Sequence, residues 1–224
     1  MLTGKGLLTP LQQRFLALFA QLPDQDQFML TGGAALAEFY LGHRLSFDLD
    51  LFTGQNELIT PMAYQLERRC AGSDLALTVT RRFAAYVEYL IADEGATVKV
   101  DLALDSPFRF EAPLQSQRGV YVNSYFDLRV DKLLAYYGRA EPRDAIDLYF
   151  ILQRDPLPML VELAAKKDPG FDLYWMAVAL DRAESFPDEL NRWPVQMLVA
   201  CDPKAVKATF KRLAIELMDQ VTGQ

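Results

Sequence analysis

Two aspartates alternate with apolar residues in the sequence Phe-Asp-Leu-Asp-Leu-Phe, residues 47–52. In a β-strand alternate side chains share one face, so Asp48 and Asp50 point the same way, with Cα atoms about 6.5–7 Å apart. At that spacing both carboxylates can reach one or two divalent metal ions. The alternative is a half-buried edge strand that shows two acids to solvent. We favour the metal site, because aspartate is a poor strand residue and two like charges on one face repel each other.

A glycine pair, Gly32-Gly33, precedes these aspartates and ends an apolar, β-compatible run over residues 28–31. Strong helix formers follow over residues 34–41, and Gly42 is a natural helix stop. The unsatisfied N–H groups at the start of such a helix can hold a phosphate. A glycine turn, a helix and an acidic strand in this order therefore predict a combined metal and phosphate site.

A third acid, Asp101, lies inside an otherwise apolar strand predicted over residues 97–104. Burying its charge requires a partner. One interpretation pairs Asp101 with Lys99, which lies on the same strand face. The other places it beside the first two aspartates as a third carboxylate. We prefer Asp101 to Asp93 and Asp105 for that role, because those two occupy predicted turn ends.

Lys132, Asp144 and Asp147 lie in two helices predicted further along the chain, over residues 127–137 and 142–153. The two aspartates are three residues apart and so share one helix face. Taken alone, this segment is more typical of two ordinary helices with charge pairs between residues three or four apart. Its significance depends on the carboxylates that precede it.

The other predicted elements have no catalytic motif. They are helices over residues 7–22 (with Thr9 as N-cap), 60–71, 157–167, 171–186 and 203–221, and strands over residues 75–82, 84–92 and 120–122. A hairpin turn is predicted at Asp93-Glu94-Gly95, and Gly138 is predicted to end the helix that holds Lys132. Trp175 and Trp193 are expected to be packing aromatics.

The composition fits a chain that buries a substantial core without a metal or disulfide staple, since it has 224 residues and 51% are hydrophobic. We expect two domains, an α/β core over residues 1–125 and a helical domain over residues 126–224. Cys70 and Cys201 are far apart and predict thiols rather than a disulfide. No apolar run is long enough for a membrane span and no signal-peptide pattern is present, so a cytoplasmic location is expected.

The formal net charge of −7 argues against a general nucleic-acid binder. A local basic face remains compatible with this charge. The arginines that could form one are Arg68, Arg69, Arg81, Arg82, Arg109, Arg118 and Arg129.

Two stretches resemble a known family. Gly32-Gly33 followed by Asp48-x-Asp50 resembles the first motif of polymerase β-like nucleotidyltransferases, and the whole of residues 30–53 resembles the AbiEii/AbiGii-type nucleotidyltransferase toxins. Two details differ: the second glycine stands where serine is commoner, and fourteen residues separate it from the first aspartate. Residues 132–148 resemble a second signature of the same toxins.

The resemblance implies a fold and a site. The fold is α/β (α+β), with a polymerase β-like mixed sheet, flanking helices and a C-terminal helical region that contributes to the nucleotide pocket. The implied catalytic and metal-binding residues are Asp48, Asp50 and Asp101, which would hold two Mg²⁺ ions. The implied nucleotide-binding residues are Gly32, Gly33, Arg44, Ser46, Lys132, Asp144 and Asp147.

The implied activity is transfer of a nucleoside monophosphate from an NTP, with ATP, GTP and CTP undistinguished, to an acceptor such as the 3′ end of a tRNA. A protein or small-molecule acceptor is the alternative, and a nucleotide- or partner-binding module without turnover is a third hypothesis. The protein would be the toxin of a toxin–antitoxin pair, with a cognate antitoxin protein as partner. Replacing Lys132 by alanine is expected to weaken nucleotide binding with thermal stability nearly unchanged.

Overall fold

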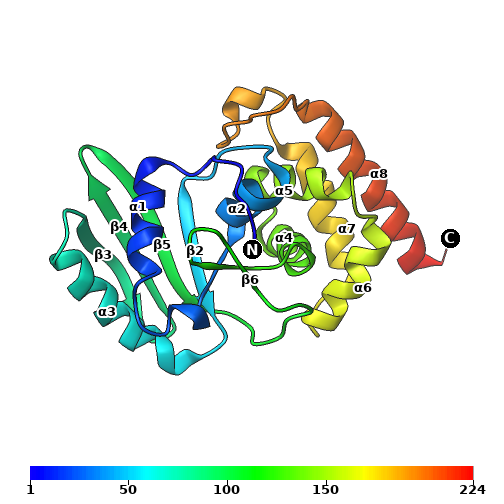
Figure 1. Ribbon diagram of the computed structural model, residues 1–224. Helices are drawn as coiled ribbons and strands as arrows, with labels where there is room; N and C mark the ends of the chain where they lie inside the picture. Colours follow the sequence, from blue (N-terminus) through cyan, green and yellow to red (C-terminus); the bar gives the residue numbers. More distant parts are fainter. Residues whose placement is uncertain (224) are drawn as a thin grey trace. The chain divides into compact units, whose positions relative to one another are not determined.

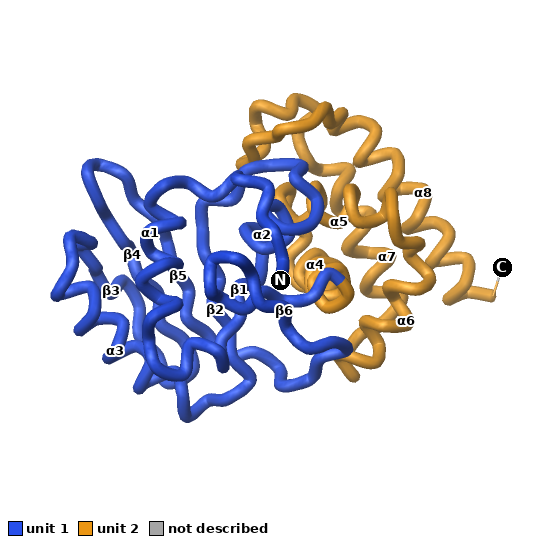
Figure 2. Tube along the Cα trace, in the orientation of Figure 1, with its two compact units in different colours: residues 1–125 blue, residues 126–224 orange. Residues whose placement is uncertain are grey.

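The computed structural model describes residues 1–223 and divides the chain into two compact units, residues 1–125 and 126–224 (Figure 2). The first unit is built on a β-sheet and the second is helical (Figure 1). Within the described residues, no helix is long and apolar enough to cross a membrane. Cys70 and Cys201 are both free thiols, as predicted.

A single mixed sheet of seven strands forms the first unit, in the order β3-β4-β5-β2-β1-β7-β6. The strands are β1 Met29–Thr31, β2 Asp48–Thr53, β3 Ala76–Phe83, β4 Tyr86–Asp93, β5 Ala96–Leu104, β6 Leu114–Gln115 and β7 Tyr121–Val122. The pairs β2–β5 and β1–β7 are parallel, and the remaining neighbours are antiparallel. The predicted strands at residues 75–82, 84–92, 97–104 and 120–122 all exist, with shifted ends.

The central strands bury one face and leave the other polar. The buried face carries Val87, Tyr89, Ile91, Val98, Val100, Leu102, Leu49 and Leu51, all almost fully inaccessible. Helix α3 (Ile59–Ala71) lies on this face. The Tyr89 hydroxyl, which points to the same side, donates a hydrogen bond to Glu67 of that helix at 3.2 Å. Helix α1 (Pro10–Phe19) also packs against β5 (Figure 1). The opposite face, called the polar face below, carries Asp48, Asp50, Lys99, Asp101, Tyr86 and Glu88.

Local sequence signals explain where these elements begin and turn. Helix α1 starts with a capping box, in which Thr9 and Gln12 exchange side-chain and backbone hydrogen bonds. The turn between β4 and β5 has positive φ at both Glu94 (45°) and Gly95 (85°), as a tight hairpin turn of this hand requires. That turn fixes the antiparallel register of the two strands.

The glycine pair begins a helix that is α-helical at first and π-helical further along. Helix α2 (Gly32–Ala35) continues into the π-helical segment η2 (Leu36–Leu41), which ends at Gly42 with a φ of 69°. Glu38 of η2 is buried, and its carboxylate accepts hydrogen bonds from the backbone N–H groups of residues 6, 7 and 8. The N-terminal segment is thereby held against the helix that follows the glycine turn.

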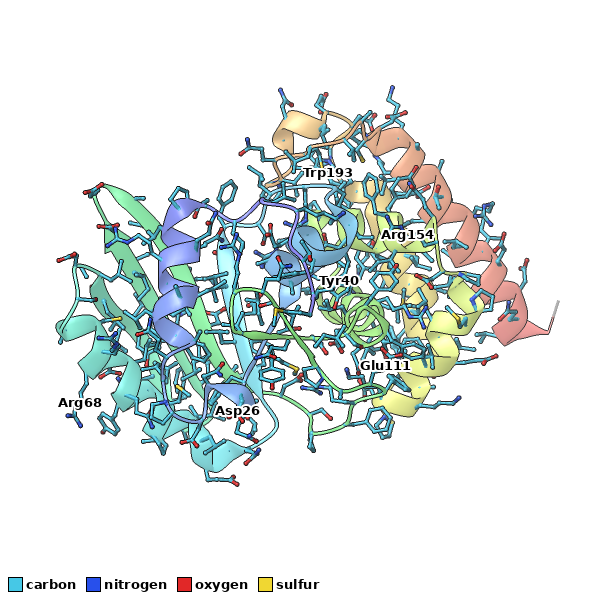
Figure 3. All side chains as sticks on the ribbon, in the orientation of Figure 1. Asp26, Tyr40, Arg68, Glu111, Arg154 and Trp193 are labelled. Atoms are coloured by element: carbon cyan, nitrogen blue, oxygen red, sulfur yellow. The ribbon has the colours of Figure 1, made fainter. Side chains whose placement is uncertain are left out.

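The helices of the second unit are α4 Tyr125–Arg139, α5 Pro142–Leu152, α6 Leu157–Lys167, α7 Leu173–Asp181 and α8 Pro203–Thr222, with short helical turns η4 Arg182–Ser185 and η5 Leu190–Arg192. Two expectations about this unit are wrong. Gly138 does not end α4, because the left-handed residue after the helix is Ala140, with a φ of 46°. Trp193, which is labelled in Figure 3, is buried as predicted. Its indole N–H donates to the Pro187 carbonyl, whereas Trp175 is 57% exposed.

Candidate functional site

Strands β2 and β5 bring the three predicted carboxylates to neighbouring positions. Asp50 is the direct register partner of Asp101 in the parallel pair, and Asp48 is the partner of Lys99. Because β2 alternates buried and half-exposed residues, Asp48 and Asp50 share the polar face with Asp101. The two aspartates of the first motif and the later acid therefore lie on adjacent strands of one sheet face.

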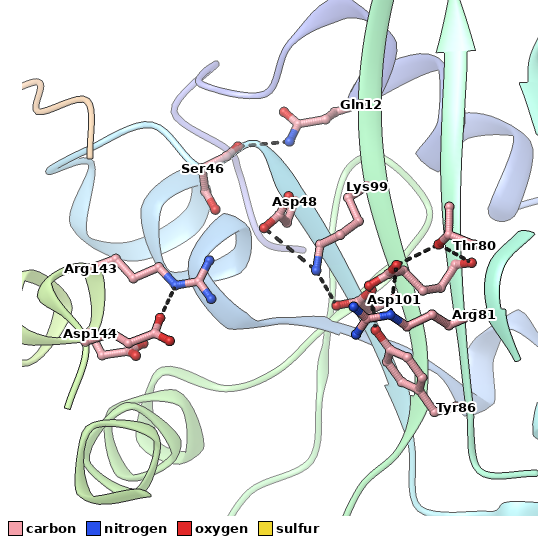
Figure 4. A network of polar contacts seen from close by, with 12 residues as sticks. Gln12, Ser46, Asp48, Thr80, Arg81, Tyr86, Lys99, Asp101, Arg143 and Asp144 are labelled. Atoms are coloured by element: carbon pink, nitrogen blue, oxygen red, sulfur yellow. Dashed lines mark hydrogen bonds and ion pairs between the residues drawn. The ribbon is translucent and has the colours of Figure 1, made fainter. Parts of the chain in front are cut away.

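Lys99 lies among these carboxylates (Figure 4). Its Nζ atom is 2.8 Å from Asp101 Oδ2 and 3.9 Å from Asp48 Oδ2. Burial opposes the ammonium charge, but the hydrogen bond to Asp101 and the negative charges of Asp101, Asp48 and Asp50 outweigh it and raise the pKa of Lys99. The structure pairs Asp101 with Lys99, and the strand register sets Asp101 opposite Asp50 as well.

Tyr86 and Glu88 extend the polar face beyond the predicted residues. The Tyr86 hydroxyl is 3.0 Å from Asp101 Oδ1 and 3.1 Å from Glu88 Oε2, and it can donate to only one of them at a time. Burial and the neighbouring Asp101 carboxylate raise the pKa of Tyr86, so the hydroxyl stays protonated. Its hydrogen bond limits how the Asp101 carboxylate can turn.

Sequence reasoning missed Tyr86 and Glu88, although a local signal could have found Glu88. In the hairpin, Asp93 pairs with Ala96, and counting outward from the turn pairs Glu88 with Asp101. Counting outward in the same way from the turn between β3 and β4, where Phe83 pairs with Tyr86, places Arg81 opposite Glu88.

The glycine turn lies directly against the Asp50 carboxylate. Gly32 has a φ of 67°, and a Cβ atom at this position would lie 1.8 Å from Asp50 Oδ2. Only glycine provides both this backbone conformation and this close approach at low cost. The first glycine of the motif is therefore required by the position of the Asp50 carboxylate.

The second glycine packs against the two predicted nucleotide-binding residues of the following turn. A Cβ atom on Gly33 would lie 2.6 Å from Arg44 Nη2 and 2.8 Å from Ser46 Oγ. Arg44 is buried, and it donates to the Leu45 carbonyl at 2.9 Å. The Ser46 carbonyl accepts a hydrogen bond from Gln12 of α1 at 2.9 Å (Figure 4), which ties this turn to the first helix.

The second unit holds its predicted site residues in two ion pairs. Lys132 Nζ of α4 is 2.7 Å from Asp147 Oδ2 of α5, with the side chains 8% and 0% exposed. Asp144 binds Arg139 through two hydrogen bonds of 2.5 and 2.7 Å. Lys132 is thus a buried residue paired across two helices, and the ordinary alternative of a charge pair within one helix does not describe it.

The residues on the polar face match a hard divalent cation in chemical type, because carboxylate oxygens are the ligands that such ions take. Among residues 1–223, however, no three His, Cys, Asp or Glu side chains converge closely enough as they stand to hold a metal ion. Lys99 supplies the positive charge between Asp48 and Asp101 instead. The donor set therefore suits a divalent ion by chemical type, whereas the carboxylates of the described residues do not close around one as they stand.

Comparison with solved structures gives similar folds in bacterial proteins. MenT4, a nucleotidyltransferase toxin from Mycobacterium tuberculosis, has a TM-score of 0.61 at 18% identity, covering 93% of this chain and 82% of that one. A candidate nucleotidyltransferase from H. pylori has a TM-score of 0.60 at 16% identity, covering 95% and 94%. JHP933 from Helicobacter pylori has a TM-score of 0.56 at 15% identity, covering 96% and 91%. At these identities the likeness is one of fold.

Sequence comparison gives a direct assignment. No curated protein matches the chain. The family model described as the nucleotidyl transferase AbiEii toxin of type IV toxin–antitoxin systems matches residues 14–192, well over half of the chain. This match confirms the family expected from residues 30–53 and 132–148. The chain therefore belongs to the AbiEii toxin family of nucleotidyltransferases.

Proposed function

We propose that this protein transfers a nucleoside monophosphate from an NTP to RNA in a Mg²⁺-dependent reaction, with the 3′ end of a tRNA as the acceptor. The observation that carries the proposal is the register of Asp50 with Asp101, with Asp48 on the same sheet face and Gly32 in contact with Asp50. This arrangement sets three acids on one face of two adjacent strands, with the glycine turn against one of them.

The proposed reaction exchanges one bond to phosphorus for another. An acceptor hydroxyl oxygen attacks the α-phosphorus, the bond from that phosphorus to the bridging oxygen breaks, and pyrophosphate leaves. Asp48 and Asp50 would hold the metal ions, and Asp101 would either share in holding them or accept the proton of the attacking hydroxyl. Bound Mg²⁺ would neutralise charge on the attacking and leaving oxygens.

Other residues of the first unit would position the triphosphate. The backbone N–H groups of Gly32 and Gly33 lie at the start of a helix, where the helix dipole favours negative charge. Arg44 and Ser46 lie beside Gly33 and add a guanidinium and a hydroxyl. Lys99 would leave the carboxylates as the metal ions enter.

In the second unit, Lys132 is the proposed contact to the phosphates, as an ammonium point charge. Asp147 would orient it through the observed ion pair, and Asp144 would hold Arg139 through its two hydrogen bonds. As a toxin, the protein would act in the cytoplasm, and a cognate antitoxin protein would counteract it.

A transfer assay tests this proposal. The purified protein is incubated with each α-³²P-labelled NTP, Mg²⁺ and either total RNA or total protein, and the products are separated on denaturing gels. We expect label in tRNA, and we expect its loss when EDTA is present or when the tRNA has been oxidised with periodate to destroy the terminal diol.

A matched pair of variants shows whether transfer requires the acids of the site in particular or any aspartate in this part of the chain. Asp50→Asn should abolish labelling, whereas Asp105→Asn should retain it, because Asp105 follows β5 and pairs with Arg109 at 2.9 Å. Label in protein instead of RNA would show that the acceptor is a protein and would contradict the proposed RNA acceptor. Nucleotide binding without transfer to RNA, protein or small molecules would favour a binding module.

A further inference from the structure

Two aromatic side chains lie beside the carboxylates on the polar face. Phe83 ends β3 and is the register partner of Tyr86, which begins β4. Their rings are stacked, with centroids 6.5 Å apart and planes 28° apart. Tyr86 in turn contacts Asp101 through its hydroxyl, so this aromatic pair adjoins the proposed catalytic acid.

The sheet register arranges these residues in two neighbouring rows across the strands. One row contains charged residues, with Arg81, Glu88, Asp101 and Asp50 as successive partners. The adjacent row contains Phe83, Tyr86, Ala103 and Phe52. Because residues two apart on a strand share a face, both rows lie on the polar face.

The strand order separates the aromatic pair from the glycine turn. Gly32 and Gly33 follow β1 and contact the β2 side of the site, whereas Phe83 and Tyr86 lie on β3 and β4. Strand β5, with Asp101, lies between them. In the proposed function the glycine turn binds the phosphates of the NTP. The acceptor would then approach Asp101 from the opposite side, where the aromatic pair lies.

We propose that Phe83 and Tyr86 form the platform on which the terminal bases of a single-stranded RNA acceptor stack before transfer. This inference rests on the proposed function and adds the acceptor site to it. Bases of unpaired RNA stack on aromatic side chains of open sheet faces, and the contact tolerates any base because each has a π-face.

The exposure of Phe83 agrees with a binding role, and Tyr86 beside it is half-buried. Phe83 is 65% exposed, so its ring contributes little to the core of the sheet. Arg81 lies two residues before it, and its exposed guanidinium is 3.8 Å from Glu88, a weak surface pair. Such a guanidinium can exchange that partner for a phosphate of the RNA backbone. A stacking ring with an adjacent exposed cation favours a nucleic acid over a protein acceptor.

RNA binding tests the platform independently of transfer. The full chain carrying Asp48→Asn, which blocks turnover, is titrated into a fluorescein-labelled 10-nucleotide single-stranded RNA in Mg²⁺, and anisotropy gives the Kd. Adding Phe83→Ala should raise the Kd by roughly 5- to 150-fold, the measured range for losing one stacked base. Phe83→Trp should keep the Kd within about twofold, because the larger ring still stacks.

Tyr64→Ala supplies the matched control. Tyr64 is 59% exposed and lies on α3, on the opposite face of the sheet, so its loss should leave the Kd unchanged. In the active background, Phe83→Ala should raise the KM for RNA while the KM for NTP stays constant.

The outcomes separate the two proposals. An RNA affinity that is equal in Phe83→Ala and in its parent, or no RNA binding by the parent, overturns the platform. Transfer to RNA that persists with an unchanged KM in Phe83→Ala overturns the platform but keeps the proposed function. RNA binding that depends on Phe83 without any transfer to RNA retains the platform and overturns the proposed function.

Discussion

Replacing Lys132 by alanine should destabilise the helical unit, because its ammonium is buried against a fully buried carboxylate. The sequence alone predicted a helix residue whose loss would leave thermal stability nearly unchanged. The structure changes that expectation, since the Lys132 and Asp147 side chains are 8% and 0% exposed and their charged atoms are 2.7 Å apart. Removing the lysine takes an ion-pair partner away from a carboxylate that is fully buried.

The magnitude follows from the loss of that buried ion pair. Breaking a buried pair by removing one partner costs about 3–5 kcal/mol, whereas the net value of the intact pair is far smaller. A stability of about 5–15 kcal/mol would thus fall by roughly a fifth or more. Lys132→Met combined with Asp147→Leu removes both charges at similar volume and should return the stability to within about 1–2 kcal/mol of the wild type.

Urea denaturation followed by tryptophan fluorescence measures this directly, because Trp175 and Trp193 both lie in the helical unit. With an m-value of about 1–3 kcal/mol/M, the midpoint for Lys132→Ala should fall by at least about 1 M. Arg212→Ala provides a control, since its ion pair with Glu216 is exposed and should contribute less than about 1 kcal/mol.

The expectation fails if Lys132→Ala and Arg212→Ala have equal midpoints, because the loss of a buried ion-pair partner would then carry no cost. It also fails if the double variant is less stable than Lys132→Ala. The nucleotide affinity of Lys132→Ala must be measured below its unfolding transition, so that a lost phosphate contact is distinguished from a lost fold.

Three further predictions concern the first unit. Asp48→Asn and Asp50→Asn should abolish transfer with near-normal urea midpoints, since each replacement is nearly isosteric and relieves like-charge repulsion; wild-type turnover with normal Mg²⁺ dependence would exclude the metal role. Gly32→Ala should abolish Mn²⁺ binding, measured by electron paramagnetic resonance, because its Cβ displaces the Asp50 carboxylate, and should cost about 1–2 kcal/mol for its positive φ; unchanged Mn²⁺ affinity would contradict this. Burial raises the pKa of the Cys70 thiol to about 11, so at pH 8 the thiol is protonated and iodoacetamide should alkylate it only after unfolding, as mass spectrometry can check; rapid labelling of the native protein would contradict this.

Local sequence patterns were sufficient for most of the elements and for part of the site. Thr9 and Pro10 mark the start of α1, Glu94-Gly95 marks a hairpin, and the alternation around Asp48 and Asp50 places both on one face. Each of these signals acts over a few residues, so the covalent chain itself fixes the geometry. The end of α4 was mistaken, because Gly138 is also compatible with a helix interior and the chain turns at Ala140.

Only the tertiary structure decided which distant residues meet. The parallel pairing of β2 with β5 sets Asp50 opposite Asp101 and brings Lys99 to Asp48, and no local pattern specifies that register. The packing of α4 against α5 buried Lys132 on Asp147, although its own helix would allow an exposed lysine. The reason is physical: spacing along a strand or helix follows from backbone geometry, whereas register and burial follow from how separate elements pack around a shared core.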